Sequence, residues 1–204
     1  MFTRVRLADA LTALGAEPSP QLFRQLEEMY RQPTRFYHTD QHISECLAAL
    51  DQHTALAERR AEVEIAIWFH DVIYDSRRSD NEEQSASLAI DVLSGLRVAR
   101  DRTARIEAMI LATKSHRAHD RDSQLLLDID LGILGQPPAV FARYDEAIRR
   151  EYAWVPEEQY RAGRADVLKT FLGRPGIYVT RTFRELYERQ ARENIQQRLV
   201  ELDG

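Results

Sequence analysis

Apolar residues recur every three or four positions along nearly the whole chain, the spacing that places them on one face of an α-helix. One such stripe follows Pro20, and another follows Thr39, a candidate N-cap. The one stretch with a strand bias, 177–180, is too short to build a sheet. The pattern therefore predicts an all-α fold, a bundle of about eight to ten helices.

Local signals predict where several of these helices begin. Ser79 or Asp80, with an acid three residues later, forms a capping-box pattern that should open a helix. Pro156 suits the first helical position, and a further helix should start after 137–138. A short apolar helix is expected over 125–134, and the glycine-containing segment 173–176 should be a turn between the last two helices.

Length and composition limit the classes of protein that the chain can belong to. With 204 residues we expect one domain spanning 1–204. The net charge of −5 argues against a dedicated nucleic-acid-binding module. No apolar run reaches the ~20 residues of a membrane span, and Asp9 interrupts the N-terminal segment, so we expect neither membrane association nor a signal peptide. The single cysteine, Cys46, suits a small buried residue and a reducing compartment, which predicts a cytoplasmic protein.

Histidine and aspartate occur where an apolar core would be expected. His70 and Asp71 lie within the apolar segment 65–74, and burying such a pair without partners would be costly. A bound metal ion would remove that cost, whereas the alternative is a solvated pair at a helix end. Asp128 and Asp130 interrupt the apolar segment 125–134; one of them could be an N-cap, but the pair is not explained by capping alone.

His38 and His42 are four residues apart, a spacing that places two ligands on one helix face if both are helical. Thr39 is a candidate cap, however, so His38 is expected just before the helix. Either histidine could instead serve in packing or lie on the surface.

Together these segments resemble the HD superfamily of metal-dependent phosphohydrolases, and in particular a bacterial family of predicted HD phosphohydrolases of about 200 residues. The resemblance covers nearly the whole chain, in the segments 35–39, 68–75, 80–83, 112–116, 127–135 and 150–152. It implies an all-α HD fold and places four residues on the metal-ligand positions, namely His42, His70, Asp71 and Asp130.

Two imidazoles and two carboxylates suit Mn²⁺, Fe²⁺, Co²⁺, Ni²⁺ or Zn²⁺, and Mg²⁺ where phosphate oxygens complete the shell. Asp71 is expected to orient the attacking water as well as to bind metal. The resemblance also implies a supporting acid near the doublet, Glu82 or Glu83, although either could simply cap a helix. Whether one or two ions bind stays open, since His116 could be a second-site ligand, a phosphate contact or a helix-end residue; His119 is expected at the surface.

Phosphate recognition needs a cation, for which Lys114 is the first candidate and Arg35 a weaker one. With His38 and His116 they form the predicted substrate-binding set. The predicted function is metal-dependent hydrolysis of a phosphate ester or anhydride in a nucleotide or other small phosphorylated metabolite. The alternatives are a nucleotide-binding sensor and a di-iron oxygenase on the same scaffold. The C-terminal region 137–204 could form a pocket wall or a homodimer surface, and its apolar stripe fits ordinary core packing equally well.

Overall fold

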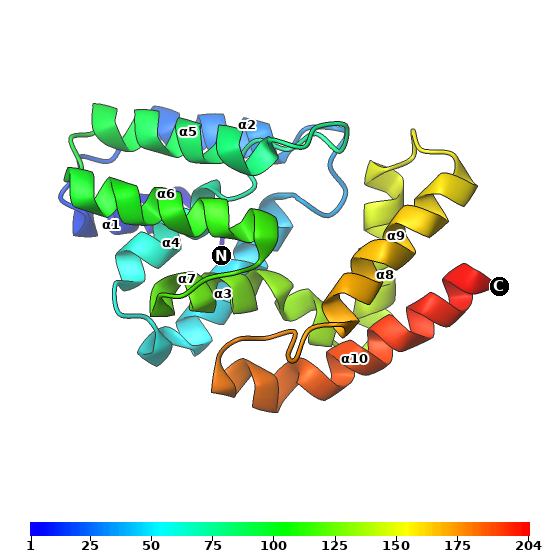
Figure 1. Ribbon diagram of the computed structural model, residues 1–204. Coiled ribbons are helices and arrows are strands. Elements are labelled where there is room, and N and C mark those ends of the chain that lie inside the picture. Colours follow the sequence, from blue (N-terminus) through cyan, green and yellow to red (C-terminus); the bar gives the residue numbers. More distant parts are fainter. The chain divides into compact units, whose positions relative to one another are not determined.

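The computed structural model describes residues 1–204 and is entirely helical (Figure 1), which confirms the all-α prediction. It has ten α-helices and two short 3₁₀ helices, η1 and η2, and no strand. In chain order the elements are α1 (Arg4–Ala13), α2 (Pro20–Tyr30), α3 (Asp40–Gln52), η1 (Thr54–Leu56), α4 (Arg60–Phe69), α5 (Asn81–Gly95), α6 (Arg100–Ser115), α7 (Arg121–Asp130), η2 (Leu131–Gly135), α8 (Pro138–Glu151), α9 (Glu157–Leu172) and α10 (Arg181–Asp203).

The predicted helix starts are confirmed in part. Thr39 is the N-cap of α3, and its hydroxyl oxygen accepts a hydrogen bond from the Gln41 amide at 3.3 Å. Helix α5 begins at the expected place, but its capping box is absent. The Asp80 carboxylate instead accepts hydrogen bonds from the side chains of Arg78 and Gln84, so it is not available to the backbone of the first turn.

Helix α7 begins earlier than the apolar run suggested. It starts at Arg121, and the Asp120 carboxylate accepts a hydrogen bond from the Ser123 amide at 2.9 Å, as an N-cap does. Asp128 lies inside the last turn of α7 and is not an N-cap, whereas Asp130 ends α7 and occupies the N-cap position of η2, without a side-chain cap hydrogen bond. Pro156 is likewise one residue outside α9, at its N-cap position rather than inside its first turn.

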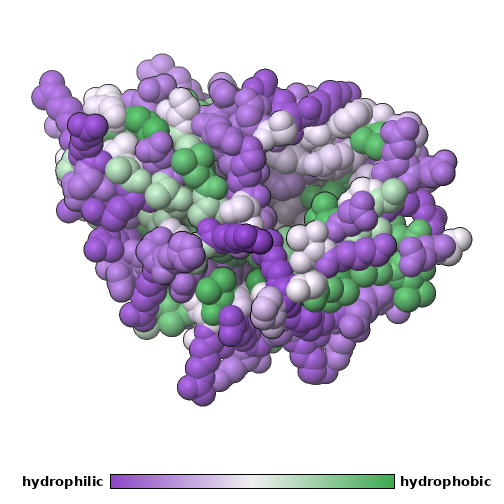
Figure 2. All heavy atoms as spheres, viewed as in Figure 1, coloured by the Kyte–Doolittle hydropathy of each residue, from purple (hydrophilic) through white to green (hydrophobic).

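No single helix is long and apolar enough to cross a membrane, although 121–135 and 138–151 meet the length and composition criteria when taken as one bent pair. The surface seen in Figure 2 is dominated by hydrophilic residues, with smaller apolar patches between them.

The chain divides into two compact units, residues 1–129 and 130–204. In the first unit α4 is the central helix, and α1, α3, α5 and α6 pack against it, with α5 and α6 side by side (Figure 1). Every residue of α4 from Glu62 to Phe69 is buried. The two buried acids on α4 are paired: Glu62 with Arg105 of α6 at 2.7 Å, and Glu64 with Arg6 of α1 at 2.8 Å.

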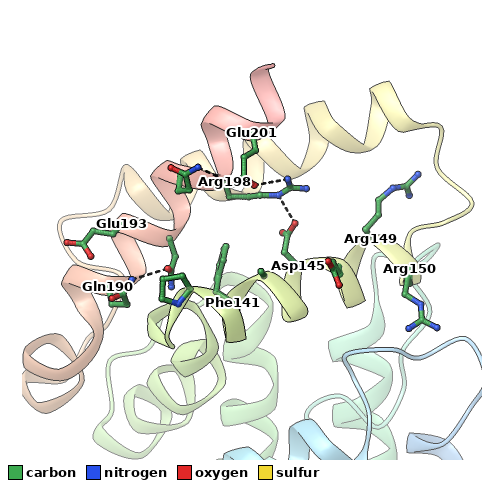
Figure 3. A pocket seen from close by; sticks show the side chains of 13 residues that line it. Phe141, Asp145, Arg149, Arg150, Gln190, Glu193, Arg198 and Glu201 are labelled. Carbon is green, nitrogen blue, oxygen red and sulfur yellow. Dashed lines mark hydrogen bonds and ion pairs between the residues drawn. The ribbon is translucent and has the colours of Figure 1, made fainter.

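In the second unit α10 packs against α9 and η2, and η2 also contacts α8. A groove runs between α8 and α10, and Figure 3 shows Asp145 of α8 pointing across it to Arg198 of α10. The carboxylate of Asp145 is buried and is held by Arg198 at 2.6 Å and by Arg164 of α9 at 2.9 Å. This buried carboxylate therefore joins the three long helices of the unit. The prediction of one domain over 1–204 stays a prediction.

The close approach of η2 to α10 predicts the effect of a substitution at Gly135. A Cβ atom at Gly135 would lie 2.5 Å from the Cβ of Tyr187 and 2.9 Å from its carbonyl oxygen. We expect Gly135→Ala to lower the free energy of unfolding by about 1–3 kcal/mol, as overpacking does. Urea denaturation of the variant measures the change. Gly132→Ala, at the same 3₁₀ helix but with no atom within 4 Å of the added methyl, is the control. Equal stability of the two variants would contradict the packing argument.

Candidate metal centre

Four side chains that are far apart in the sequence meet at one place. His42 projects from the first turn of α3, His70 and Asp71 follow directly on α4, and Asp130 ends α7. One ligand atom from each of the four lies within 4.8 Å of those of the other three. The structure thus brings together the complete set that the resemblance implied, and this group could hold a metal ion.

The separations of the donor atoms fit a single ion. The Nε2 atoms of His42 and His70 are 3.3 Å apart, and the Oδ2 atom of Asp71 lies 3.0 Å from His70 Nε2 and 3.5 Å from His42 Nε2. Ligands about 2.1 Å from an ion are roughly 3.0 Å apart at right angles and roughly 3.4 Å apart in a tetrahedron. Two nitrogens and two carboxylates also form a donor set typical of borderline divalent ions.

The centre is buried on its histidine side and open on its carboxylate side. The side chains of His42 and His70 are 2 % and 1 % exposed, whereas that of Asp71 is 19 % exposed. Asp130 is also partly exposed. An ion that takes six ligands would have positions left beyond these four, and water or a substrate oxygen could then approach it from the carboxylate side.

The hydrogen bonding of His70 orients its ring for ligation. Its Nδ1 atom lies 3.0 Å from the carbonyl oxygen of Ile67, a bond in which Nδ1–H donates. The lone pair is therefore on Nε2, which faces the other ligands. A backbone carbonyl that fixes the tautomer of a ligating histidine is a common support of metal sites. The ring of His42 is packed against the buried Cys46 thiol, one helical turn later, with Sγ 3.7 Å from Nε2.

Hydrogen bonds at the start of α4 and the cluster at its end set how α7 lies against it. At the start, the buried carboxylate of Asp122 on α7 accepts hydrogen bonds from the amides of Glu58 at 2.7 Å and Arg59 at 3.0 Å. These amides precede α4, where a negative charge is favourable. At the other end of both helices, Asp130 joins His70 and Asp71. The start of α7 therefore lies near the start of α4, and the carboxyl ends of the two helices meet at the candidate metal centre.

Aromatic rings flank the centre. Tyr37 lies against His42 with ring centroids 4.7 Å apart, and His38 stacks on Tyr74 at 4.0 Å. His38 precedes α3, as its position before the Thr39 cap predicted. Its ring centroid is 6.1 Å from that of His42, so His38 lies beside the centre without belonging to the four-residue group.

The other predicted site residues lie in different surroundings. Lys114 forms an ion pair with Glu83 and donates to the Ser79 carbonyl, and both charged side chains are exposed. Glu82 is in the first turn of α5 and partly exposed. His116 is the left-handed C-cap residue of α6, with φ 50°, and His119 is exposed as expected. None of these is among the four clustered residues.

Arg35 is buried, and its guanidinium donates to backbone carbonyl oxygens rather than facing open solvent. Its expected role in phosphate binding stays a prediction, but the observed contacts are those of a structural group. Asp122 is a supporting residue that the sequence analysis did not identify. A polar residue near the start of a helix usually caps its own helix, so nothing local indicated that it would reach α4.

Comparisons with models of known protein families, with curated proteins and with solved structures find no match to this chain.

The cluster predicts that the chain binds a divalent transition metal. Loss of an outer partner of a metal ligand already weakens binding by about 10–100-fold. We therefore expect Asp130→Asn to raise the Kd for Mn²⁺ or Co²⁺ by at least as much, measured by calorimetric titration of metal-free protein. Asp91→Asn, at an exposed position of α5, should leave the Kd unchanged. If both variants bind metal with the same Kd, Asp130 is not a metal ligand.

Bound metal should also stabilise the fold, because the four ligands are gathered only in the folded chain. At a free metal concentration of 100 Kd the gain is about 2.7 kcal/mol. Thermal unfolding with and without EDTA measures it. A Tm that EDTA leaves unchanged in metal-loaded protein would contradict the prediction.

The ion pair of Lys114 with Glu83 predicts a pH dependence. The hydrogen bond from Lys114 lowers the pKa of Glu83 below its usual 4.5, and the bond to Glu83 raises the pKa of Lys114 above its usual 10.5. The stabilisation is therefore present between these two values, is lost as pH falls through the lowered pKa, and is lost as pH rises through the raised one. Both side chains are exposed, so the effect is small. The Tm difference between wild type and Glu83→Gln should shrink as the pH falls below the usual 4.5 and vanish once the Glu83 carboxyl is protonated in the folded chain; a difference that does not change over this fall in pH would refute the pairing.

Proposed function

We propose that this chain is a metal-dependent phosphohydrolase that cleaves a phosphate ester or anhydride of a small phosphorylated metabolite, such as a nucleotide. The observation that carries the proposal is the group of His42, His70, Asp71 and Asp130, whose ligand atoms lie within 4.8 Å of one another. The order of these ligands along the chain and the helices that present them agree with the HD-type pattern seen in the sequence.

A divalent ion held by these four residues would lower the pKa of a bound water and polarise a phosphoryl oxygen. The residues of the chain supply the rest of the arrangement. His42 and His70 would hold the ion from the buried side, and the partly exposed Asp71 and Asp130 border the side from which substrate could enter. A carboxylate has two oxygens, so Asp71 can bind with one and accept a proton from the attacking water with the other.

The rigidity of the centre supports catalysis rather than loose metal binding. His70 is fixed by the Ile67 carbonyl, and His42 is packed between the ring of Tyr37 and the thiol of Cys46. Ligands that are locked before the substrate arrives lose little entropy on reaching the reactive geometry. Lys114, the first candidate for a phosphate contact, forms an ion pair with the exposed Glu83, and its contact with a substrate phosphate stays a prediction.

The proposal predicts metal-dependent phosphate release that requires Asp71. Metal-free protein should be assayed against nucleoside mono-, di- and triphosphates and small phosphoesters, with Mn²⁺, Co²⁺, Ni²⁺, Fe²⁺ and Mg²⁺ in turn. We expect Asp71→Asn to lower kcat by at least about 10³-fold, a fall larger than loss of one general base typically causes because a metal ligand is lost as well. Asp91→Asn is the matched control.

The outcomes separate the proposal from its alternatives. Phosphate release that is lost in Asp71→Asn and kept in Asp91→Asn supports a phosphohydrolase and identifies its substrate class. Tight nucleotide binding without product favours a sensor. Two irons per chain with consumption of oxygen would favour the oxygenase, and either result would overturn the proposal.

A further inference from the structure

The segment that follows α4 carries the clustered side chains of His70 and Asp71. Two backbone carbonyl groups of this segment accept hydrogen bonds from the buried guanidinium of Arg35. We infer that Arg35 is a positioning residue of the metal centre, which sets the positions of its ligands by holding the backbone of the His–Asp doublet. The inference rests on the metal site of the proposed function, but it does not depend on which reaction the site performs.

The guanidinium of Arg35 makes three hydrogen bonds to backbone oxygens. One Nη1 atom donates to the carbonyl of Asp71 at 2.6 Å and to that of His38 at 3.0 Å, and Nη2 donates to the carbonyl of Val72 at 2.7 Å. The last carbonyls of a helix have no partner within it, and a cation there is favoured by the helix dipole. The carbonyls of Asp71 and Val72 lie just past Phe69, the last residue of α4, so Arg35 holds the backbone of the doublet beside the carboxyl end of that helix.

Arg35 is itself held firmly in place. Only 5 % of the residue is exposed, and its guanidinium lies near the rings of Tyr30 and Tyr74, 5.2 and 5.6 Å from their centroids. The Tyr30 hydroxyl donates to the Trp68 carbonyl at 3.0 Å, so a second side chain forms a hydrogen bond to the backbone at the carboxyl end of α4. Burial raises the pKa of Tyr30 well above 10, which keeps its hydroxyl protonated as a donor.

These contacts connect the segments that carry three of the ligands. His38 lies just before α3, four residues from His42, and Asp71 and Val72 lie just after α4. One planar side chain bridges both segments, so the separation of His42 from His70 and Asp71 depends on it. Functional side chains must be held to within about 0.5 Å, which a water in place of the guanidinium would not ensure.

The shape of the guanidinium matters as well as its charge. Two nitrogens in one plane reach the carbonyls of two consecutive residues, which a single ammonium group cannot do with the same geometry. Lysine at this position should therefore restore only part of the effect. This difference separates a positioning role from a simple need for positive charge.

The test is a titration of metal-free wild type, Arg35→Gln and Arg35→Lys with Co²⁺, followed by visible absorption. The band positions and intensities report the coordination geometry, and the titration gives the Kd without any substrate. We expect Arg35→Gln to raise the Kd at least about tenfold, as loss of an outer partner does, and to change the spectrum. Arg35→Lys should give an intermediate Kd.

Arg164→Gln is the matched control. Arg164 is similarly buried, at 8 % exposed, but its partner is Asp145 in the other unit. This variant should lower the Tm while leaving the Kd for Co²⁺ and the spectrum unchanged. Comparing the two variants separates an effect on metal binding from the loss of stability that follows when any buried arginine is replaced.

Circular dichroism first shows which variants are folded. A folded Arg35→Gln with the wild-type Kd and spectrum overturns the inference. If that variant does not fold, Arg35→Lys decides, and wild-type values for it overturn the inference equally. If neither folds with Co²⁺ in excess, Arg35 is needed for folding as such and the assignment fails. Wild type that binds no Co²⁺ would instead remove the metal site of the proposed function.

Discussion

The burial of every residue of α4 from Glu62 to Phe69 is the constraint on which the first unit depends. A helix that is surrounded on all sides cannot satisfy its end groups or its charged side chains with water. The carboxylate of Asp122 on α7 therefore accepts a hydrogen bond from a backbone amide that precedes α4. Tyr30 donates to a carbonyl in the last turn of α4, and Arg35 donates to the carbonyl of Asp71 just after it. The candidate metal centre lies at this second end, so the groups that allow the helix to be buried also bring the ligands together.

The same constraint explains the charged residues in the core of this unit. Glu62 and Glu64 are nearly inaccessible, and each is paired with an arginine from a neighbouring helix. Removing one partner from such a pair leaves an uncompensated buried charge, so these contacts fix which helices lie beside α4. The arrangement favours one packing over others that would be equally apolar.

Patterns confined to a few neighbouring residues predicted the helices well. The apolar period, Pro20 and the Thr39 cap each act within one or two turns, and the structure bears them out. Helix α1 was not anticipated, because no apolar stripe had been assigned to the residues before Pro20. The capping box predicted at Asp80 is absent because a carboxylate near a helix start has several partners within reach, and here it accepts hydrogen bonds from Arg78 and Gln84.

The four-residue cluster was expected only through the family resemblance, because spacing alone cannot show that α3, α4 and α7 converge. The pairing of Lys114 with Glu83 depends on how α6 lies beside α5, which neither helix encodes by itself.

The two tryptophans of the chain lie one in each compact unit, in opposite surroundings. Trp68 is fully buried, two residues before His70, with its ring centroid 4.5 Å from that of Phe2, while Trp154 is 48 % exposed in the second unit. A buried indole fluoresces at shorter wavelength than an exposed one and is shielded from quenchers dissolved in water. The intrinsic emission of the unlabelled protein therefore contains a separate signal for each unit, and the signal of Trp68 in the first unit is the one that iodide or acrylamide leaves intact.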